Sequence, residues 1–126
     1  MVECDCKDCL EHTTLNVVKL DKNAVKLDKD KIRTDLIPVL PLEQIARVLT
    51  YGAKKYSDRN WEKGFDFSRC YGAALRHLFS WWDGEDTDAE SNLSHLAHAM
   101  CCLLFLQEYQ LRHTGNDDRP HKQVIT

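Results

Sequence analysis

The sequence predicts an all-α fold, a small bundle of three main helices. Three segments carry apolar residues at intervals of three and four, the spacing that places side chains on one face of a helix. Hydrophobic residues make up 43% and charged residues 29% of the chain, a balance typical of a globular protein, and 126 residues suffice for one domain with its own core. Three apolar helix faces leave surface to bury, so we expect a homo-oligomer that completes the bundle.

The predicted helices cover residues 41–56, 69–83 and 88–112. Pro41 suits the first turn of the first helix, because its fixed φ angle is helical and its missing N–H is not needed there. Ser68 is the expected cap of the second helix and Gly84 its end. Gly115 is the expected stop of the third helix.

Composition divides the chain into three parts. Residues 1–30 form a cysteine-rich appendage with a charged linker, residues 31–113 the helical domain, and residues 114–126 a polar tail without clear structure. Within the first part, Val-Lys-Leu-Asp-Lys occurs at 18–22 and again at 25–29, which permits either a short hairpin or a charged linker.

Four potential soft metal ligands lie within nine residues near the N-terminus: Cys4, Cys6, Cys9 and His12. Thiolates and imidazoles are the ligands that zinc prefers, so the segment could bind a zinc ion. The spacing does not match the strong paired Cys-x-x-Cys patterns, and a thiol-rich tail without metal fits equally well.

Charge and hydropathy restrict the function classes. A net charge of −3 argues against a general nucleic-acid binder and against binding to anionic membranes. No apolar run reaches the roughly 18 to 20 residues that cross a bilayer, and the N-terminus lacks a basic region followed by an apolar stretch. We therefore expect a soluble cytoplasmic protein that holds any anionic ligand locally.

Acids and imidazoles gather around the junction of the second and third predicted helices. Spacings of three, four and three would place four polar residues on one side of a helix: Asp88, Ser91, His95 and His98. Three more potential ligands lie upstream: His77, Glu85 and Asp86. The sequence therefore predicts a metal or phosphate site at this junction.

A simpler interpretation of the same residues is structural. Thr87 and Glu90 have the spacing of a capping box, and Asp88 in a first helical turn suits the positive end of the helix dipole. Histidines are also common as hydrogen-bonded core or surface residues. Both interpretations remain open at this stage.

The segment after the first helix mixes cations, aromatic rings and an amide: Lys54, Lys55, Tyr56, Arg59, Asn60 and Trp61. Ammonium and guanidinium groups bind phosphate, and an indole face stacks on a nucleotide base. This segment therefore predicts a nucleotide site, although Trp61 could equally fill the core. Arg76 and His77 interrupt the apolar second helix and, if buried, would need partners.

Six motifs in order resemble a phage-encoded family named after a dATP/dGTP diphosphohydrolase N-terminal domain. They are Lys-Ile-Arg-Thr-Asp-Leu-Ile-Pro at 31–38, Tyr-Gly-Ala-Lys-Lys-Tyr at 51–56, Arg-Asn-Trp-Glu-Lys-Gly at 59–64, Arg-His-Leu at 76–78, Gly-Glu-Asp-Thr-Asp-Ala-Glu-Ser at 84–91 and His-Leu-Ala-His-Ala at 95–99. The resemblance covers residues 31–106 and implies a link to the MazG-like (MazZ-like) all-α pyrophosphohydrolases.

This resemblance implies metal-dependent hydrolysis of purine nucleoside triphosphates such as dATP and dGTP to monophosphate and pyrophosphate, in the host cytoplasm during phage infection. MazG-like enzymes use Glu-x-x-Glu and Glu-x-x-Asp pairs on successive helices. In this chain His95 and His98 occupy the acid positions of the second pair, and the helix 69–83 has no Glu-x-x-Glu. Three outcomes are open: magnesium on the acids, manganese or another transition metal on the histidines, or histidines that contact phosphate without metal.

If the chain is such an enzyme, phosphoryl transfer requires charge neutralisation and a positioned water, and each candidate residue has an expected role in it. The expected metal ligands are Glu85, Asp86, Asp88, His95 and His98. The expected catalytic residues are Glu90, which would orient the attacking water, and Asp88. The expected substrate-binding residues are Lys54, Lys55, Tyr56, Arg59, Asn60, Trp61, Arg76 and His77.

Two other functions fit the same residues. A non-catalytic protein could sequester a nucleotide or a host-defence signalling nucleotide, with the acids capping a helix and the histidines donating to phosphate. A regulatory bundle with zinc bound at the N-terminus is a third interpretation.

Overall fold

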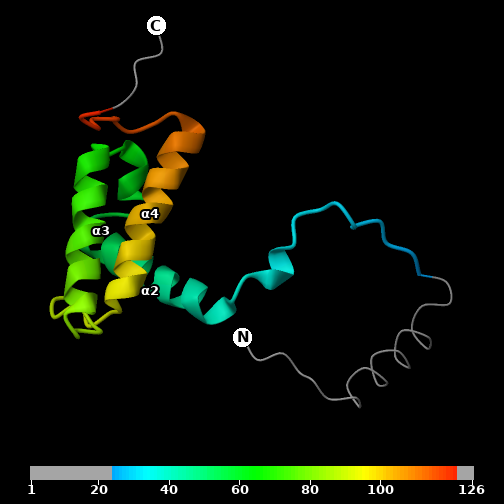
Figure 1. Cartoon of the computed structure of the whole chain (residues 1–126), viewed down its shortest axis with the longest axis horizontal. Helices are drawn as coiled ribbons and strands as arrows, with labels where there is room; N and C mark the ends of the chain where they lie inside the picture. Colours follow the sequence, from blue (N-terminus) through cyan, green and yellow to red (C-terminus); the bar gives the residue numbers. More distant parts are fainter. Residues whose placement is uncertain (1–23, 122–126) are drawn as a thin grey trace, which may run out of the picture. The chain divides into compact units, whose positions relative to one another are not determined.

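Three α-helices make up most of the chain that the computed structural model describes, residues 24–121 (Figure 1). They are α2 (Val39–Lys55), α3 (Phe67–Trp82) and α4 (His95–Arg112), with short 3₁₀ turns at η1 (Thr34–Leu36) and η2 (Asn60–Lys63). The described residues contain no β-strand beyond isolated bridges. The predicted all-α fold is confirmed.

The chain separates into two compact units, residues 1–36 and 37–126. Residues 24–36 of the first unit are exposed, and Arg33 pairs with Asp35 at 2.7 Å. The second unit holds the three α-helices. The predicted zinc ligands Cys4, Cys6, Cys9 and His12 lie outside the described residues.

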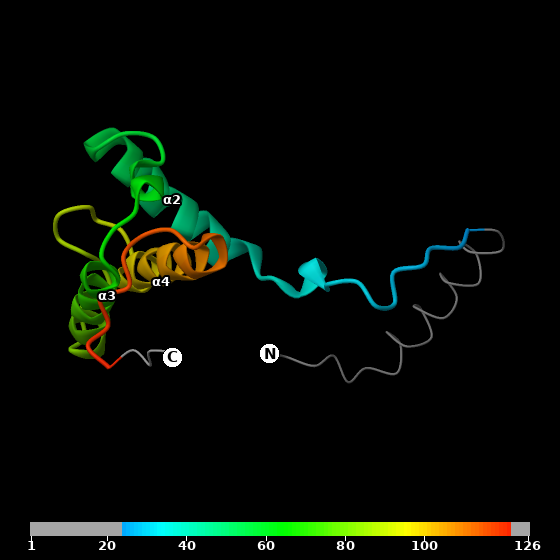
Figure 2. The same ribbon diagram turned by 90° about the horizontal axis from the view of Figure 1, so that it is seen from above.

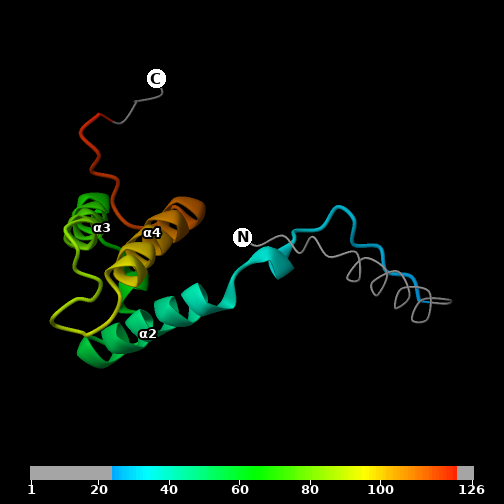
Figure 3. The same cartoon turned by 60° about the horizontal axis from the view of Figure 1, so that its bottom comes forward.

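The central element of the second unit is α4, which contacts both other helices. It runs beside α3, and α2 crosses it at an angle (Figures 2 and 3). Ala97 and Cys101 of α4 pack on Val48 of α2, and these small side chains let the two helices approach closely. Toward the far end of α4, Tyr109 packs on Phe67 of α3.

The third helix begins seven residues later than predicted. Residues 83–94 form a loop, and α4 starts at His95, where the Ser94 hydroxyl accepts a hydrogen bond from the Ala97 N–H at 3.2 Å. Asn92 has a φ angle of 57°, a left-handed conformation that a helix excludes. The expected capping box of Thr87 and Glu90 is therefore wrong, because Ser94 is the cap.

The second helix also differs from the prediction at its start. It begins at Phe67, so Ser68 lies inside the first turn and is not the cap. The Asp118 carboxylate accepts hydrogen bonds from the Ser68 N–H, at 2.8 Å, and from the Ser68 hydroxyl. Asn116 donates to Asp66 at 2.9 Å. The described part of the segment after residue 113 has no helix or strand, but these contacts attach it to the start of α3.

Large apolar side chains remain on the surface of α3. Tyr71, Phe79 and Trp82 are 59%, 67% and 82% exposed. Tyr71 and Trp82 lie within the predicted amphipathic helix 69–83, yet the described residues do not bury them. Homo-oligomerisation therefore stays a prediction. None of the helices in the described residues is both long and apolar enough to span a bilayer.

Candidate metal and nucleotide site

Three imidazoles meet where α3 passes the first turn of α4. His77 comes from α3, and His95 and His98 come from α4, one turn apart. The Nδ1 atoms of His77 and His95 lie 2.9 Å apart. The rings of His77 and His98 are stacked, with centroids 4.5 Å apart and an interplanar angle of 8°.

Asp88 brings a carboxylate to this cluster from the 83–94 loop. One ligand atom from each of His77, Asp88 and His95 lies within 4.8 Å of the others. Asp88 accepts hydrogen bonds from the N–H and the hydroxyl of Ser91, at 3.0 and 3.1 Å, and the Ser91 Oγ lies 2.7 Å from His98 Nε2. Asp88, Ser91, His95 and His98 therefore do come together, but through a folded loop and not along one helix.

The most buried member of the cluster is His95, which is 4% exposed. Its Nε2 is the one buried side-chain nitrogen or oxygen in the described residues that makes no hydrogen bond. Glu85 Oε1 lies 3.3 Å from this nitrogen, close enough for an ion pair but without hydrogen-bond geometry. An unsatisfied buried polar group costs about 1–3 kcal/mol, so its presence calls for a functional explanation.

The environment sets the charge of the cluster. Burial opposes ionisation of Asp88, but hydrogen bonds from Ser91 and the nearby imidazoles outweigh it and lower the pKa of this carboxyl. Burial, together with the neighbouring imidazoles, lowers the pKa of His77 and of His98. Near neutral pH these shifts favour an anionic carboxylate at Asp88 and neutral imidazoles at His77 and His98, the protonation states that bind divalent cations. The residues present fit a metal ion.

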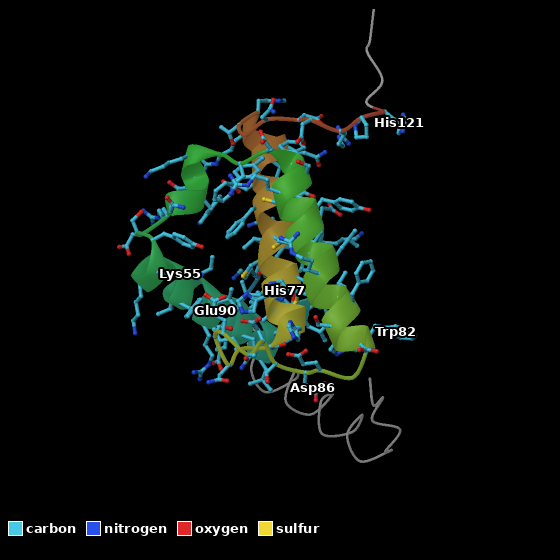
Figure 4. All side chains as sticks on the ribbon, turned by 90° about the vertical axis from the view of Figure 1, so that its left-hand side faces the viewer. Lys55, His77, Trp82, Asp86, Glu90 and His121 are labelled. Atoms are coloured by element: carbon cyan, nitrogen blue, oxygen red, sulfur yellow. The ribbon has the colours of Figure 1, made fainter. Side chains whose placement is uncertain are left out.

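The predicted ligands divide into two groups. Asp88 and His95 belong to the cluster, and His77, which the sequence assigned to substrate, joins them. Asp86 is exposed, and its backbone carbonyl accepts the His95 N–H at 3.0 Å (Figure 4). Glu85 contacts the cluster through His95 Nε2, and the fifth predicted ligand, His98, contacts Ser91 and stacks on His77.

Glu90 connects the loop to α2. Its Oε1 accepts hydrogen bonds from the Lys55 ammonium at 2.5 Å and from the Tyr51 hydroxyl at 3.1 Å, and Figure 4 shows Glu90 and Lys55 on neighbouring segments. The hydrogen bond from Lys55, with that from Tyr51, lowers the pKa of Glu90. Tyr51 is a residue that the sequence analysis missed. The signal was its position four residues before Lys55, on the same helix face.

A pocket of about 740 Å³ joins the histidine and aspartate cluster to the basic and aromatic segment after α2. Drug-sized ligands and cofactors occupy pockets of about 300–1,000 Å³, so the volume suits a nucleotide. Its lining includes predicted substrate residues, Lys55, Tyr56, Arg59, Asn60, Trp61 and His77. It also includes Asp88, Glu90 and His98. Lys54 and Arg76, both exposed, are not among the lining residues.

Trp61 packs against the core and also lines the pocket. Its ring stacks on Phe105 with centroids 4.8 Å apart, and its backbone carbonyl accepts the Tyr109 hydroxyl at 2.5 Å. The same residue lines the pocket. Trp61 therefore lies between the core and the pocket. Tyr56, which also lines the pocket, is 66% exposed, so its ring is the more accessible of the two for stacking on a base.

Two cysteines of α4 also line the pocket, Cys101 and Cys102. Burial raises the pKa of Cys101 to about 12 and that of Cys102 to about 11. Both remain neutral thiols at physiological pH, and a thiol is a poor nucleophile and metal ligand compared with a thiolate. They are apolar walls of the pocket.

Comparison with known proteins agrees with the resemblance. Residues 21–119 match the family described as "dATP/dGTP diphosphohydrolase, N-terminal". A protein of Salmonella phage PMBT28 named "dATP/dGTP diphosphohydrolase" is 36% identical over 77 residues, which cover 61% of this chain and 26% of that relative. The chain thus spans about a quarter of the relative's length. No solved structure matches the chain. Because the match extends over most of its length, the chain belongs to the dATP/dGTP diphosphohydrolase N-terminal family.

Proposed function

We propose that this protein hydrolyses purine deoxynucleoside triphosphates, dATP or dGTP, to the monophosphate and pyrophosphate in a metal-dependent reaction. The observation that supports the proposal is the single pocket whose lining includes His77 and Asp88 together with the basic and aromatic segment after α2. Phosphate transfer needs charge neutralisation and positioning more than covalent catalysis, and this pocket provides groups for both.

The basic and aromatic residues of the pocket would bind different parts of the nucleotide. Tyr56 offers a ring for stacking on the purine, and Asn60 offers an amide for its polar edge or for the sugar. Lys55 and Arg59 offer cations for the triphosphate. Since an ammonium group has three donors, Lys55 can bind a phosphate oxygen without releasing Glu90.

In the reaction, a water oxygen bonds to the α-phosphorus, the bond from the α-phosphorus to the bridging oxygen breaks, and pyrophosphate leaves. A divalent ion at His77, Asp88 and His95 would supply positive charge to the phosphates and lower the pKa of a bound water. The water's proton would pass to a pocket base. Glu90 is the predicted base, although its lowered pKa and its bonds to Lys55 and Tyr51 also suit it to hold Lys55 in place.

The rival function is nucleotide binding without cleavage. It is favoured by the donor set, because α3 presents His77 where MazG-like enzymes carry paired glutamates. It is also favoured by coverage, because the relative named as a hydrolase is about four times as long as the matched region. In this case the same pocket would sequester the nucleotide.

Product analysis separates the two functions. The purified chain, stripped of metal, is incubated with each deoxy- and ribonucleoside triphosphate in magnesium, in manganese or in chelator, and the products are separated by chromatography. We expect dAMP or dGMP with one equivalent of pyrophosphate, only when metal is present. Retention of the nucleotide by the protein without any product would establish the sequestering function and refute hydrolysis.

A matched pair of variants ties the activity to the site. Asp88→Asn removes a carboxylate charge from the cluster, whereas Asp58→Asn removes one from the exposed loop at the other side of the same pocket. Turnover is expected to disappear in the first variant and to persist in the second. Equal activity in the two variants would move catalysis away from the cluster.

A further inference from the structure

The ligand atoms of the cluster distinguish between classes of divalent metal. Magnesium demands oxygen ligands in a near-ideal octahedron, and it is usually bound by one or two carboxylates plus water and phosphate. Here two of the three converging side chains are imidazoles, and the carboxylate is the single Asp88. Imidazole nitrogen suits iron, nickel, copper and zinc, and two histidines with one carboxylate is the ligand set of non-haem iron(II) sites.

The spacing of the nitrogens agrees with a shared ion. His77 Nδ1 and His95 Nδ1 lie 2.9 Å apart. Two ligand nitrogens each about 2.1 Å from an ion, at right angles, lie about 3.0 Å apart. Two neutral imidazoles can also reach this distance when one Nδ1 carries a proton and donates it to the other.

The opposite nitrogen of His95 decides which tautomer the site favours. His95 Nε2 faces the Glu85 carboxylate at 3.3 Å. If the proton were on His95 Nδ1, two acceptors would face each other across that distance in a buried place. With the proton on Nε2, an N–H faces the carboxylate, and the Nδ1 lone pair points into the cluster.

Glu85 thus has the position of an outer-shell partner. Histidines that bind metals almost always donate their other ring N–H to a carboxylate or carbonyl, which fixes the tautomer and strengthens the ligand. The side chain of Glu85 is 55% exposed, so it can move the few tenths of an ångström that align this contact without disturbing the core.

We propose that His77, Asp88 and His95 form a two-histidine, one-carboxylate site that selects a transition-metal dication over magnesium, with Glu85 as the positioning residue that holds His95 as an Nδ1 ligand. This inference deepens the proposed function, since it names the metal class of the same site, but it is tested in the absence of nucleotide. Failure of hydrolysis and failure of metal selection are therefore distinguishable.

The test uses cobalt(II) as a spectroscopic probe of the full-length chain. Cys4, Cys6 and Cys9 are replaced by serine in every sample, so that N-terminal thiolates cannot contribute to the signal. Visible absorption of bound cobalt is titrated, first alone and then with a hundredfold excess of magnesium. We expect one equivalent of cobalt per chain, retained in magnesium and displaced by zinc. Displacement by magnesium, or no saturable binding, would overturn the proposal.

Variants then assign the ligands. His77→Ala is expected to lower cobalt affinity at least 100-fold, and His113→Asn, at the opposite end of α4, is expected to leave it unchanged. Asn suits the left-handed conformation at position 113, where φ is 56°. Circular dichroism checks that each variant is folded. A folded His77→Ala protein with unaltered cobalt affinity would refute the ligand set.

Glu85 is tested by rescue. Outer-shell substitutions typically cost about 10- to 100-fold in metal affinity, and this range is expected for Glu85→Ala. Glu85→Gln keeps an acceptor oxygen for the His95 N–H and is expected to recover part of the loss, while Glu43→Gln, exposed on α2, serves as the control. A cobalt spectrum and affinity unchanged in Glu85→Ala would remove the positioning role.

Discussion

The two ends of α4 differ in how they treat buried polar groups. At the C-terminal end, the hydroxyl of Tyr109 is paired with the backbone of Trp61, and Asp118 and Asn116 bind the first turn of α3. At the N-terminal end, His95 is as deeply buried as the core, yet one ring nitrogen makes no hydrogen bond. The buried polar group at the C-terminal end is paired within the protein, whereas one buried nitrogen at the N-terminal end has no hydrogen-bond partner.

Tyr109 and the cluster residues are buried in different ways: the polar group of Tyr109 is paired within the protein, whereas those of the cluster converge beside a pocket. Tyr109 is 1% exposed, and burial raises its pKa to about 12, so its hydroxyl stays protonated and donates. The hydroxyl is satisfied within the protein. At the other end, ligand atoms of His77, Asp88 and His95 converge, and His77 and Asp88 line the pocket, so these groups are placed where a metal and a nucleotide could use them.

The largest expected effect concerns the structural end. Tyr109→Ala removes a fully buried ring that stacks on Phe67, and such aromatic truncations cost about 3–5 kcal/mol in the free energy of unfolding. Chemical denaturation followed by circular dichroism measures this loss. If the variant kept the stability of the unmodified chain, the C-terminal end of α4 would not be the structural end.

The next effect concerns the functional end. Asp88→Asn is expected to lower turnover at least about 100-fold, because it removes the only carboxylate of the cluster, while helical content is retained. Steady-state kinetics and circular dichroism on the same sample provide both values. A variant that lost helical structure would show that Asp88 stabilises the loop through its Ser91 hydrogen bonds. That result would contradict the assignment of a functional role to the N-terminal end of α4 and a structural role to its C-terminal end.

A smaller effect is expected where the loop meets α2. Lys55→Met keeps the length of the side chain but removes the ammonium group that binds Glu90, and it is expected to raise KM about tenfold with a smaller change in kcat. Lys63→Met, exposed and not part of the pocket lining, is the control. Equal KM values in both variants would separate Lys55 from phosphate binding.

The smallest expected effect, on the stability of a His95 variant, tests most directly whether the N-terminal end of α4 is a functional end. His95→Leu replaces an imidazole whose Nε2 lacks a hydrogen bond with an apolar side chain of similar size. In the metal-free protein the free energy of unfolding should change by no more than about 1 kcal/mol, because removal of the unsatisfied Nε2 offsets loss of the Nδ1 contact with His77. Thermal denaturation in chelator measures it. Strong destabilisation would mean that His95 is a structural residue after all.

The sequence predicted the elements that depend on local pattern. Apolar periodicity located α2, α3 and most of α4, because a helix that packs on one face must repeat its apolar residues at three and four. It failed at residues 88–94, where the spacing is also helical. There, the left-handed Asn92 and the Asp88 side chain bonded to Ser91 fold the chain into a loop, and neither feature has a periodic signature.

The sequence predicted which residues form the candidate site better than it predicted how they are arranged. Asp88, Ser91, His95 and His98 do converge, although the shared helix face that predicted this does not exist. The partnership of Asp118 with Ser68 joins residues fifty positions apart, and no local rule indicates such a contact. His77 was assigned to substrate because its distance from His95 depends on how α3 packs on α4.

The most direct test is a crystal structure of the full-length chain with manganese and a non-hydrolysable dATP or dGTP analogue, with anomalous scattering to locate the metal. We expect a manganese peak held by His77, Asp88 and His95, with triphosphate oxygens nearby and the purine near Tyr56. A nucleotide bound outside this pocket, or manganese held elsewhere with the cluster unchanged, would contradict it.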